Sequence, residues 1–134
     1  MLLDGVVVGG FNVVDLDRLH RAIGWPVIAV TRGDPDRTRI RRALRRWFPR
    51  DAARRERLLF RHRLFRVPTT ARPIRASSVG APSRDAAALL ARATVRGLWP
   101  EPLRLAHLVA SARALSPRPR EPLSPRNRVR EPGL

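Results

Sequence analysis

Acidic side chains are the residues of this 134-residue sequence best suited to chemistry, because the chain contains no cysteine. Asp4 follows a short apolar run, and α/β folds place metal-binding carboxylates at the ends of such strands. Asp4 is therefore a candidate metal ligand and catalytic carboxylate. On the pattern alone, an aspartate that simply starts a turn before Gly5 is the favoured interpretation.

The other acidic and imidazole groups have structural explanations. Capping of helix N-termini accounts for Asp15 and Asp17, and equally for Asp34 and Asp36. The histidines are too scattered to predict a metal cluster, and we interpret all three as surface or helix-face residues: His20, His62 and His107. The missing cysteine excludes disulfides and thiolate zinc sites, and the missing lysine excludes a phosphate loop ending in Gly-Lys-Ser/Thr.

Arginine supplies the strongest signal. All 28 basic residues are arginines, which against 11 acidic residues gives a net charge of +17. Residues 37–66 hold thirteen of them against two acids, whereas residues 1–36 hold three against five. Arginine binds phosphate bidentately, and aromatic side chains such as Trp47 and Phe60 lie in the same segment. We predict contact with nucleic acid through these residues: Arg32, Arg37, Arg41, Arg42, Arg45, Arg46 and Arg96. The alternative, arginine from a GC-rich codon bias, predicts a more even spread.

The elements that position these groups follow from hydrophobic periodicity. Residues 2–8 predict one buried strand, and residues 26–30 predict a second. Between them, Asp15 is expected to cap a short helix that Gly24 ends in the left-handed conformation. The order strand, helix, strand favours a parallel pair of strands.

The next segment predicts a basic helix and two short strands. Asp34 has the form of an N-cap followed by a proline at the first helical position. The apolar face of this helix is expected to pack on the sheet, and consists of Ile40, Ala43, Leu44 and Trp47. Residues 51–60 predict another helix, and residues 64–67 and 74–79 predict strands.

Two further helices complete the predicted domain. Ser83 is expected to cap the first, with inward positions Ala86, Leu89, Leu90 and Ala93. Pro100-Glu101-Pro102 opens the second, with inward positions Leu105, Leu108, Val109 and Ala112. We predict one layered α/β domain over residues 1–114 and a disordered Pro/Arg-rich tail over residues 115–134. No run is long enough to span a membrane, so we expect a cytoplasmic protein.

Three stretches of the sequence resemble a known family, namely residues 3–15, 19–32 and 94–111. Within them lie the short motifs Asp4-Gly5, Gly24-Trp25-Pro26 and Pro100-Glu101-Pro102, respectively. They resemble the archaeal endonuclease dU family, which is in turn similar to endonuclease V. Endonuclease V is a ribonuclease-H-like enzyme that cuts DNA near deaminated bases with magnesium. The resemblance implies that fold, Mg²⁺ as cofactor, Asp4 as its ligand, and DNA containing bases such as deoxyuridine as substrate.

The sequence also departs from that family. Relatives carry an amino-terminal portion with an Ile-Asp-Asp-like acidic strand, which has no counterpart before Met1. A Gly-His-Arg-type turn of endonuclease V is replaced by Gly80-Ala81-Pro82. We therefore expect a domain without its first strands, with weak or no cleavage activity. Its uncovered sheet edge predicts self-association or pairing with a missing amino-terminal piece. The alternatives are a non-catalytic nucleic-acid-binding or partner protein, or a decayed paralogue.

Overall fold

In the computed structural model, residues 1–115 form a mixed α/β fold with six strands and five helices. The elements are β1 (Leu2–Asp4), β2 (Val7–Val8), β3 (Asn12–Val13), α1 (Leu16–Ile23), β4 (Val27–Thr31), α2 (Arg37–Trp47), α3 (Ala52–Leu59), β5 (Phe65–Val67), β6 (Ile74–Val79), α4 (Ser83–Ala93) and α5 (Glu101–Leu115). The tail predicted from residue 115 lies outside the described residues, except for Leu115 itself. No helix within residues 1–115 is long and apolar enough to cross a membrane.

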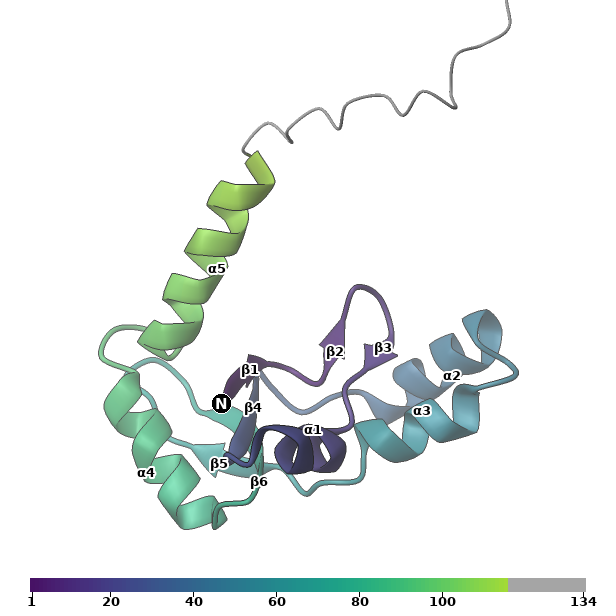
Figure 1. The fold of residues 1–134 in the computed structure, drawn as a ribbon, viewed down its shortest axis with the longest axis horizontal. Helices are drawn as coiled ribbons and strands as arrows, with labels where there is room; N and C mark the ends of the chain where they lie inside the picture. Colours follow the sequence, from purple (N-terminus) through teal and green to yellow (C-terminus); the bar gives the residue numbers. More distant parts are fainter. Residues whose placement is uncertain (116–134) are drawn as a thin grey trace, which may run out of the picture.

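A four-stranded mixed sheet organises the fold, with the strand order β1-β4-β6-β5 (Figure 1). β1 runs parallel to β4, and Asp4 pairs with Val30. β6 is antiparallel to both β4 and β5. The parallel pair expected from the first two predicted strands is confirmed, and so are strands at residues 65–67 and 74–79.

The first predicted strand is wrong in one respect, because residues 2–8 do not form a single strand. The chain leaves the sheet at Gly5, which has a φ of 81°, a conformation that side-chain-bearing residues rarely adopt. β2 then pairs with β3 as a separate two-stranded hairpin that turns through Gly9 and Gly10. Three consecutive valines favour extended backbone, but the glycine before them sends that backbone out of the sheet.

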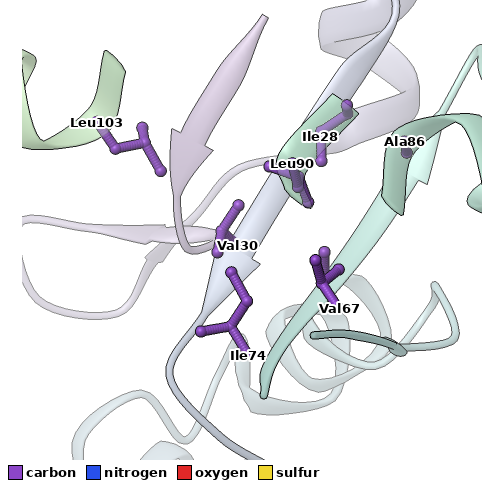
Figure 2. Close-up of a cluster of buried hydrophobic side chains, with 8 residues drawn as sticks. Ile28, Val30, Val67, Ile74, Ala86, Leu90 and Leu103 are labelled. Carbon is purple, nitrogen blue, oxygen red and sulfur yellow. The ribbon is translucent and has the colours of Figure 1, made fainter. Parts of the chain in front are cut away.

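Alternate residues of β4 face opposite sides of the sheet, and this alternation builds two cores. Val27 and Ala29 pack with Leu16 of α1 on one face. Ile28 and Val30 face the other side, where a larger cluster contains side chains from β5, β6, α4 and α5. Figure 2 shows that cluster, with labelled members Ile28, Val30, Val67, Ile74, Ala86, Leu90 and Leu103. The sheet is therefore covered by α1 on one face and by α4 with the start of α5 on the other.

Helix α1 has the predicted ends. The Asp15 carboxylate accepts a hydrogen bond of 3.0 Å from the backbone N–H of Arg18, and Gly24 ends the helix with a φ of 70°. This cap holds the pKa of Asp15 below its ordinary value of 3.8, because the backbone N–H bond stabilises the charged form.

Helix α2 begins two residues later than predicted. Asp36, not Asp34, is the N-cap and accepts a 2.9 Å hydrogen bond from the backbone N–H of Arg39. Asp34 instead pairs with Arg75 of β6 at 2.7 Å. The predicted packing of α2 on the sheet is also wrong, because α2 packs mainly against α3. Leu44 is buried, whereas Trp47 remains 66% exposed.

The last two helices differ from the prediction on their surfaces. α4 buries Ala86 and Leu90 as expected, but Leu89 is exposed, and the N-cap is Pro82 rather than Ser83. α5 buries Leu103 in its first turn. Its predicted inward face is wrong, because these side chains are more than half exposed: Leu105, Leu108 and Val109. The apolar residues recur at helical spacing, but α5 projects away from the sheet, so the sheet does not cover these side chains (Figure 1).

Candidate functional site

Asp4 is the last residue of β1 and its side chain is exposed. Within the described part of the chain, its carboxylate makes no side-chain hydrogen bond or ion pair. Because β1 and β4 are parallel, their carboxyl ends meet at the same edge of the sheet, which is where open α/β sheets bind ligands. Asp4 is thus free to bind a ligand at the position where the fold class favours one.

A pocket of about 690 Å³ opens directly beside this edge. One wall comes from Gly5, Val30 and Thr31, at the ends of the two parallel strands. Its other walls come from the start of α2 and from residues 58–64, which comprise the end of α3 and the connection to β5. The volume lies within the roughly 300–1,000 Å³ usual for ligand sites. Because α2 does not pack flat on the sheet, the space between them is a cavity and not part of the core.

A histidine–aspartate pair lies on the rim of this pocket. His62 lines it, and the His62 Nε2 atom lies 3.0 Å from Asp17 Oδ2. Arg61 Nε approaches the same carboxylate oxygen at 3.0 Å. The interpretation of His62 and Asp17 as ordinary surface and cap residues missed this pair. The two residues are 45 positions apart, so only tertiary structure brings them together.

Two of the predicted phosphate-binding arginines lie at this end of the sheet. Arg32 follows β4 directly, and its guanidinium lies over the Trp99 ring, 5.1 Å from the centroid. Arg37 lines the pocket and lies 4.6 Å from the centroid of the Phe60 ring. Both guanidinium groups lie over aromatic faces, and within residues 1–115 neither makes an ion pair with a carboxylate, although the charge of Arg37 contributes to the lowered pKa of Glu56.

The remaining predicted arginines of α2 lie on a helical hairpin formed with α3. Residues 37–60 contain ten arginines and only two acidic residues, Asp51 and Glu56. Arg41 pairs with Glu56 at 2.6 Å. The hydrogen bond from Arg41 lowers the pKa of the Glu56 carboxyl and raises the pKa of Arg41. The others are exposed and make no ion pair with an acid in residues 1–115: Arg42, Arg45 and Arg46.

Arg96 lies apart from this group, on the connection between α4 and α5. Its side chain is exposed. It is three residues from Trp99, whose ring lies against Arg32. The structure thus places Asp4, Arg32 and Arg37 near the carboxyl ends of β1 and β4, but of the three only Arg37 lines the pocket. The positive surface continues along α2, and Arg96 lies on a neighbouring loop.

The fit to a magnesium ion is incomplete. Mg²⁺ takes oxygen ligands in near-octahedral geometry, usually one or two carboxylates with waters and substrate phosphates. Among residues 1–115, no group of three or more acidic or histidine side chains gathers to hold a metal. The carboxylate of Asp4 supplies one ligand position, and further oxygen ligands would have to come from elsewhere.

Comparison with known proteins gives a consistent family. The family model described as endonuclease dU matches residues 1–114. A UPF0215 protein of Thermococcus kodakarensis is 44% identical over 112 residues, which cover 84% of this chain and 56% of that protein. A UPF0215 protein of Methanothermobacter thermautotrophicus is 41% identical over 111 residues, covering 83% and 54%. One from Deinococcus radiodurans is 38% identical over 113 residues, covering 82% and 55%.

A solved structure shares the fold. It is a protein of unknown function from Archaeoglobus fulgidus, 31% identical, with a TM-score of 0.71 over 83% of this chain and 61% of that one. The chain spans about half the length of the curated relatives it matches.

Proposed function

This chain belongs to the endonuclease dU family, and we propose that it binds DNA across the edge formed by β1 and β4 as part of a metal-dependent endonuclease. The family indicates a nuclease-related role. The finer proposal is hydrolysis of a phosphodiester near a deaminated base such as deoxyuridine, on a ribonuclease-H-like framework. The curated relatives are about twice as long as the matched segment, so this activity is proposed for the complete protein.

One observation carries the proposal, namely the meeting of acid and arginine at one edge of the sheet. Asp4 pairs in register with Val30, and Val30 lines the same pocket as Arg37. Asp4 itself does not line that pocket, so a phosphate backbone bound along α2 would have to cross the carboxyl end of the sheet to reach the carboxylate at the end of β1.

The pocket supports a role in holding a base. Enzymes that act at a particular base commonly extrude it from the helical stack into a pocket lined by apolar and aromatic side chains. Val6, Ile40 and Phe60 line this one, together with the hydroxyl-bearing Thr31 and Ser77. His62, oriented by Asp17, lies where its ring could donate or accept a hydrogen bond at the edge of a bound base or a phosphate.

Magnesium enters the proposal only through Asp4. When bound beside a phosphodiester, the ion would polarise the phosphate and activate water. Because the described residues supply a single carboxylate, we expect cleavage by this chain alone to be weak or absent. The same observation favours a second candidate function, in which the chain binds nucleic acid without cutting it.

Both candidates are tested with duplexes that differ only in one deoxyuridine. Fluorescence anisotropy with and without Mg²⁺ should give an affinity that falls steeply with salt, because phosphate binding releases counterions. Asp4→Asn should leave that affinity equal or slightly higher, since it removes a negative charge from the phosphate path. Any magnesium-dependent nicking should disappear in Asp4→Asn but persist in the control Asp85→Asn on α4.

The possible outcomes separate the two candidates. Nicking that requires Asp4 supports the endonuclease. Salt-dependent binding without nicking supports the non-catalytic function. An affinity that does not change with salt rejects both, since neither survives without phosphate contact by the arginines.

A further inference from the structure

Trp47 is a large apolar side chain that the fold leaves in water. It is the last residue of α2 and lies at helical spacing from Ile40 and Leu44, but of these three only Leu44 is buried. The Trp47 side chain remains 66% exposed. Single exposed apolar residues are common on protein surfaces, so exposure alone assigns no role to this one. Its surroundings do.

The residues that follow Trp47 fix the end of α2 in place. Phe48 packs edge-on against Phe11, in the turn between β2 and β3, with 6.1 Å between the ring centroids. The guanidinium of Arg55 on α3 lies 4.2 Å from the centroid of the Phe48 ring and pairs with Asp51 at 3.0 Å. Because α2 is tied to α3 and to the hairpin in this way, the indole ring is held out from a fixed backbone. A ligand would therefore not have to order that backbone on binding.

Positive charge accompanies this ring on the same helix. Residues 41–50 contain five arginines and no acidic residue. The guanidinium of Arg46 lies 5.2 Å from the centroid of the Trp47 ring. Arg45 and Arg46 are exposed and make no ion pair with an acid in residues 1–115. An uncharged apolar partner that covered the indole would also cover these guanidinium groups without a counter-charge, which is costly.

We propose that Trp47 is a stacking platform for an unpaired base and that the neighbouring arginines bind phosphates of the same single strand. This inference rests on the proposed binding of nucleic acid and narrows the ligand of α2 to a strand whose bases are exposed. Aromatic side chains stack on bases of any type, provided that the face of the base is free. Base faces are free in a single strand or an opened segment, but they are covered by their neighbours inside an intact duplex.

Trp25 provides a matched control within the chain. It lies on the connection between α1 and β4 and is 72% exposed, slightly more than Trp47. Four arginines lie within five residues of Trp47 in the sequence, whereas only Arg21 lies within five residues of Trp25. In the part of the chain that the structure describes, no arginine lies over the Trp25 ring. The two tryptophans therefore have similar exposure but different charge around them.

The test measures the affinity of the full chain, by fluorescence anisotropy, for three ligands. These are a short oligothymidine strand, a strand of the same length without bases, and a duplex of that length. We expect Trp47→Ala to weaken binding to oligothymidine by at least about fivefold and to leave binding to the other two ligands unchanged. Trp47→Phe keeps a smaller aromatic face and should lose less affinity. Trp25→Ala should bind all three ligands as the unsubstituted protein does.

The unsubstituted protein allows a second measurement that no folding defect of a variant can disturb. Stacking on a base quenches indole fluorescence, so oligothymidine should lower the tryptophan emission. The strand without bases should bind through its phosphates without lowering it. Most of the decrease with oligothymidine should be lost in Trp47→Phe and kept in Trp25→Phe.

The outcomes distinguish this inference from the proposed function on which it rests. Salt-dependent binding of all three ligands, with Trp47→Ala weakening them equally or not at all, would overturn the stacking role and leave phosphate binding intact. Equal losses in Trp47→Ala and Trp25→Ala would overturn it as well, and so would emission that oligothymidine does not quench. An unsubstituted protein that binds none of the three ligands would overturn both proposals.

Discussion

The two sides of this molecule are built from the same arginine-rich and alanine-rich sequence but differ in what they leave uncovered. On one side, α2 and α3 expose guanidinium groups around a pocket, with two acids against ten arginines over residues 37–60. On the other side, α5 exposes leucine and valine beside an open strand edge. The basic side suits a polyanion, whereas the neutral side suits another apolar surface.

Net charge alone is therefore a poor guide to where a partner binds. A value of +17 spread evenly would hinder any self-association and would attract nucleic acid everywhere. Here the arginines gather beyond one edge of the sheet, and the helix on the other side carries no charge between Arg104 and Arg113. The two surfaces therefore differ in the kind of partner that they suit.

The largest expected effect is a loss of stability on substitution in the buried core, compared with substitution on the exposed apolar side. Leu90 is fully buried in the core cluster, so Leu90→Ala should lower the free energy of unfolding by about 2–5 kcal/mol. Leu108 is 53% exposed, so Leu108→Ala in dilute solution should change it by less than about 0.5 kcal/mol. Urea unfolding of both variants measures the difference. Equal losses in dilute solution would mean that α5 is packed within the monomer.

The basic side is tested by removing three charges at a time. Replacing Arg42, Arg45 and Arg46 by Ala should weaken binding to duplex DNA by about 10- to 100-fold at low salt and reduce the salt slope by about 0.9 for each phosphate that the variant no longer neutralises. The matched control removes three arginines from the other side, namely Arg84, Arg92 and Arg113. Equal weakening in the two triple variants would show that binding follows net charge and not the α2 surface.

A smaller effect is expected at the cap of α1, in the framework between the two sides. Asp15→Ala should lower the free energy of unfolding by about 1 kcal/mol at neutral pH, because the Arg18 N–H loses its partner. The folded pKa of Asp15 lies below its ordinary value of 3.8, so the cap is at full strength above that value. Its contribution should fade as the pH drops through the lowered pKa.

Asparagine is the informative replacement at this position. It caps helices nearly as well as aspartate but does not titrate, so Asp15→Asn should keep most of the stability and lose this part of the acid dependence. Thermal melts of the unsubstituted protein and both variants at neutral pH and near pH ~3 measure both effects. A stability difference between the unsubstituted protein and Asp15→Ala that does not shrink in acid would contradict the capping role.

The smallest effect is expected from the exposed pair between Arg41 and Glu56. Because such pairs contribute little to stability, Glu56→Gln should shift the melting temperature only slightly. The released guanidinium should instead tighten DNA binding modestly, by less than the triple arginine variant weakens it. A weaker affinity after Glu56→Gln would show that the pair orients Arg41 for binding.

Local sequence signals predicted much of the framework. The side chain of Asp15 and the left-handed Gly24 mark the ends of α1 because capping depends on neighbouring residues only. The strand at residues 27–31 follows from a run of apolar and β-branched side chains, whereas in the strand at residues 74–79 only Ile74 and Val79 are β-branched. The start of α2 was misplaced because Asp34 and Asp36 are equally good caps. In the structure Asp36 caps the helix, and Asp34 instead pairs with Arg75, which is distant in the sequence.

The sequence by itself determined the charge, its concentration in residues 37–66, the helix caps and the apolar periodicity, since each depends on residues close together in the chain. Only the tertiary structure decided which of these surfaces meet. It joined Asp17 to His62 across 45 residues, opened a pocket where α2 stands off the sheet, and left the apolar spacing of α5 facing solvent. Periodicity specifies that a face is apolar, whereas what covers that face depends on how distant elements pack.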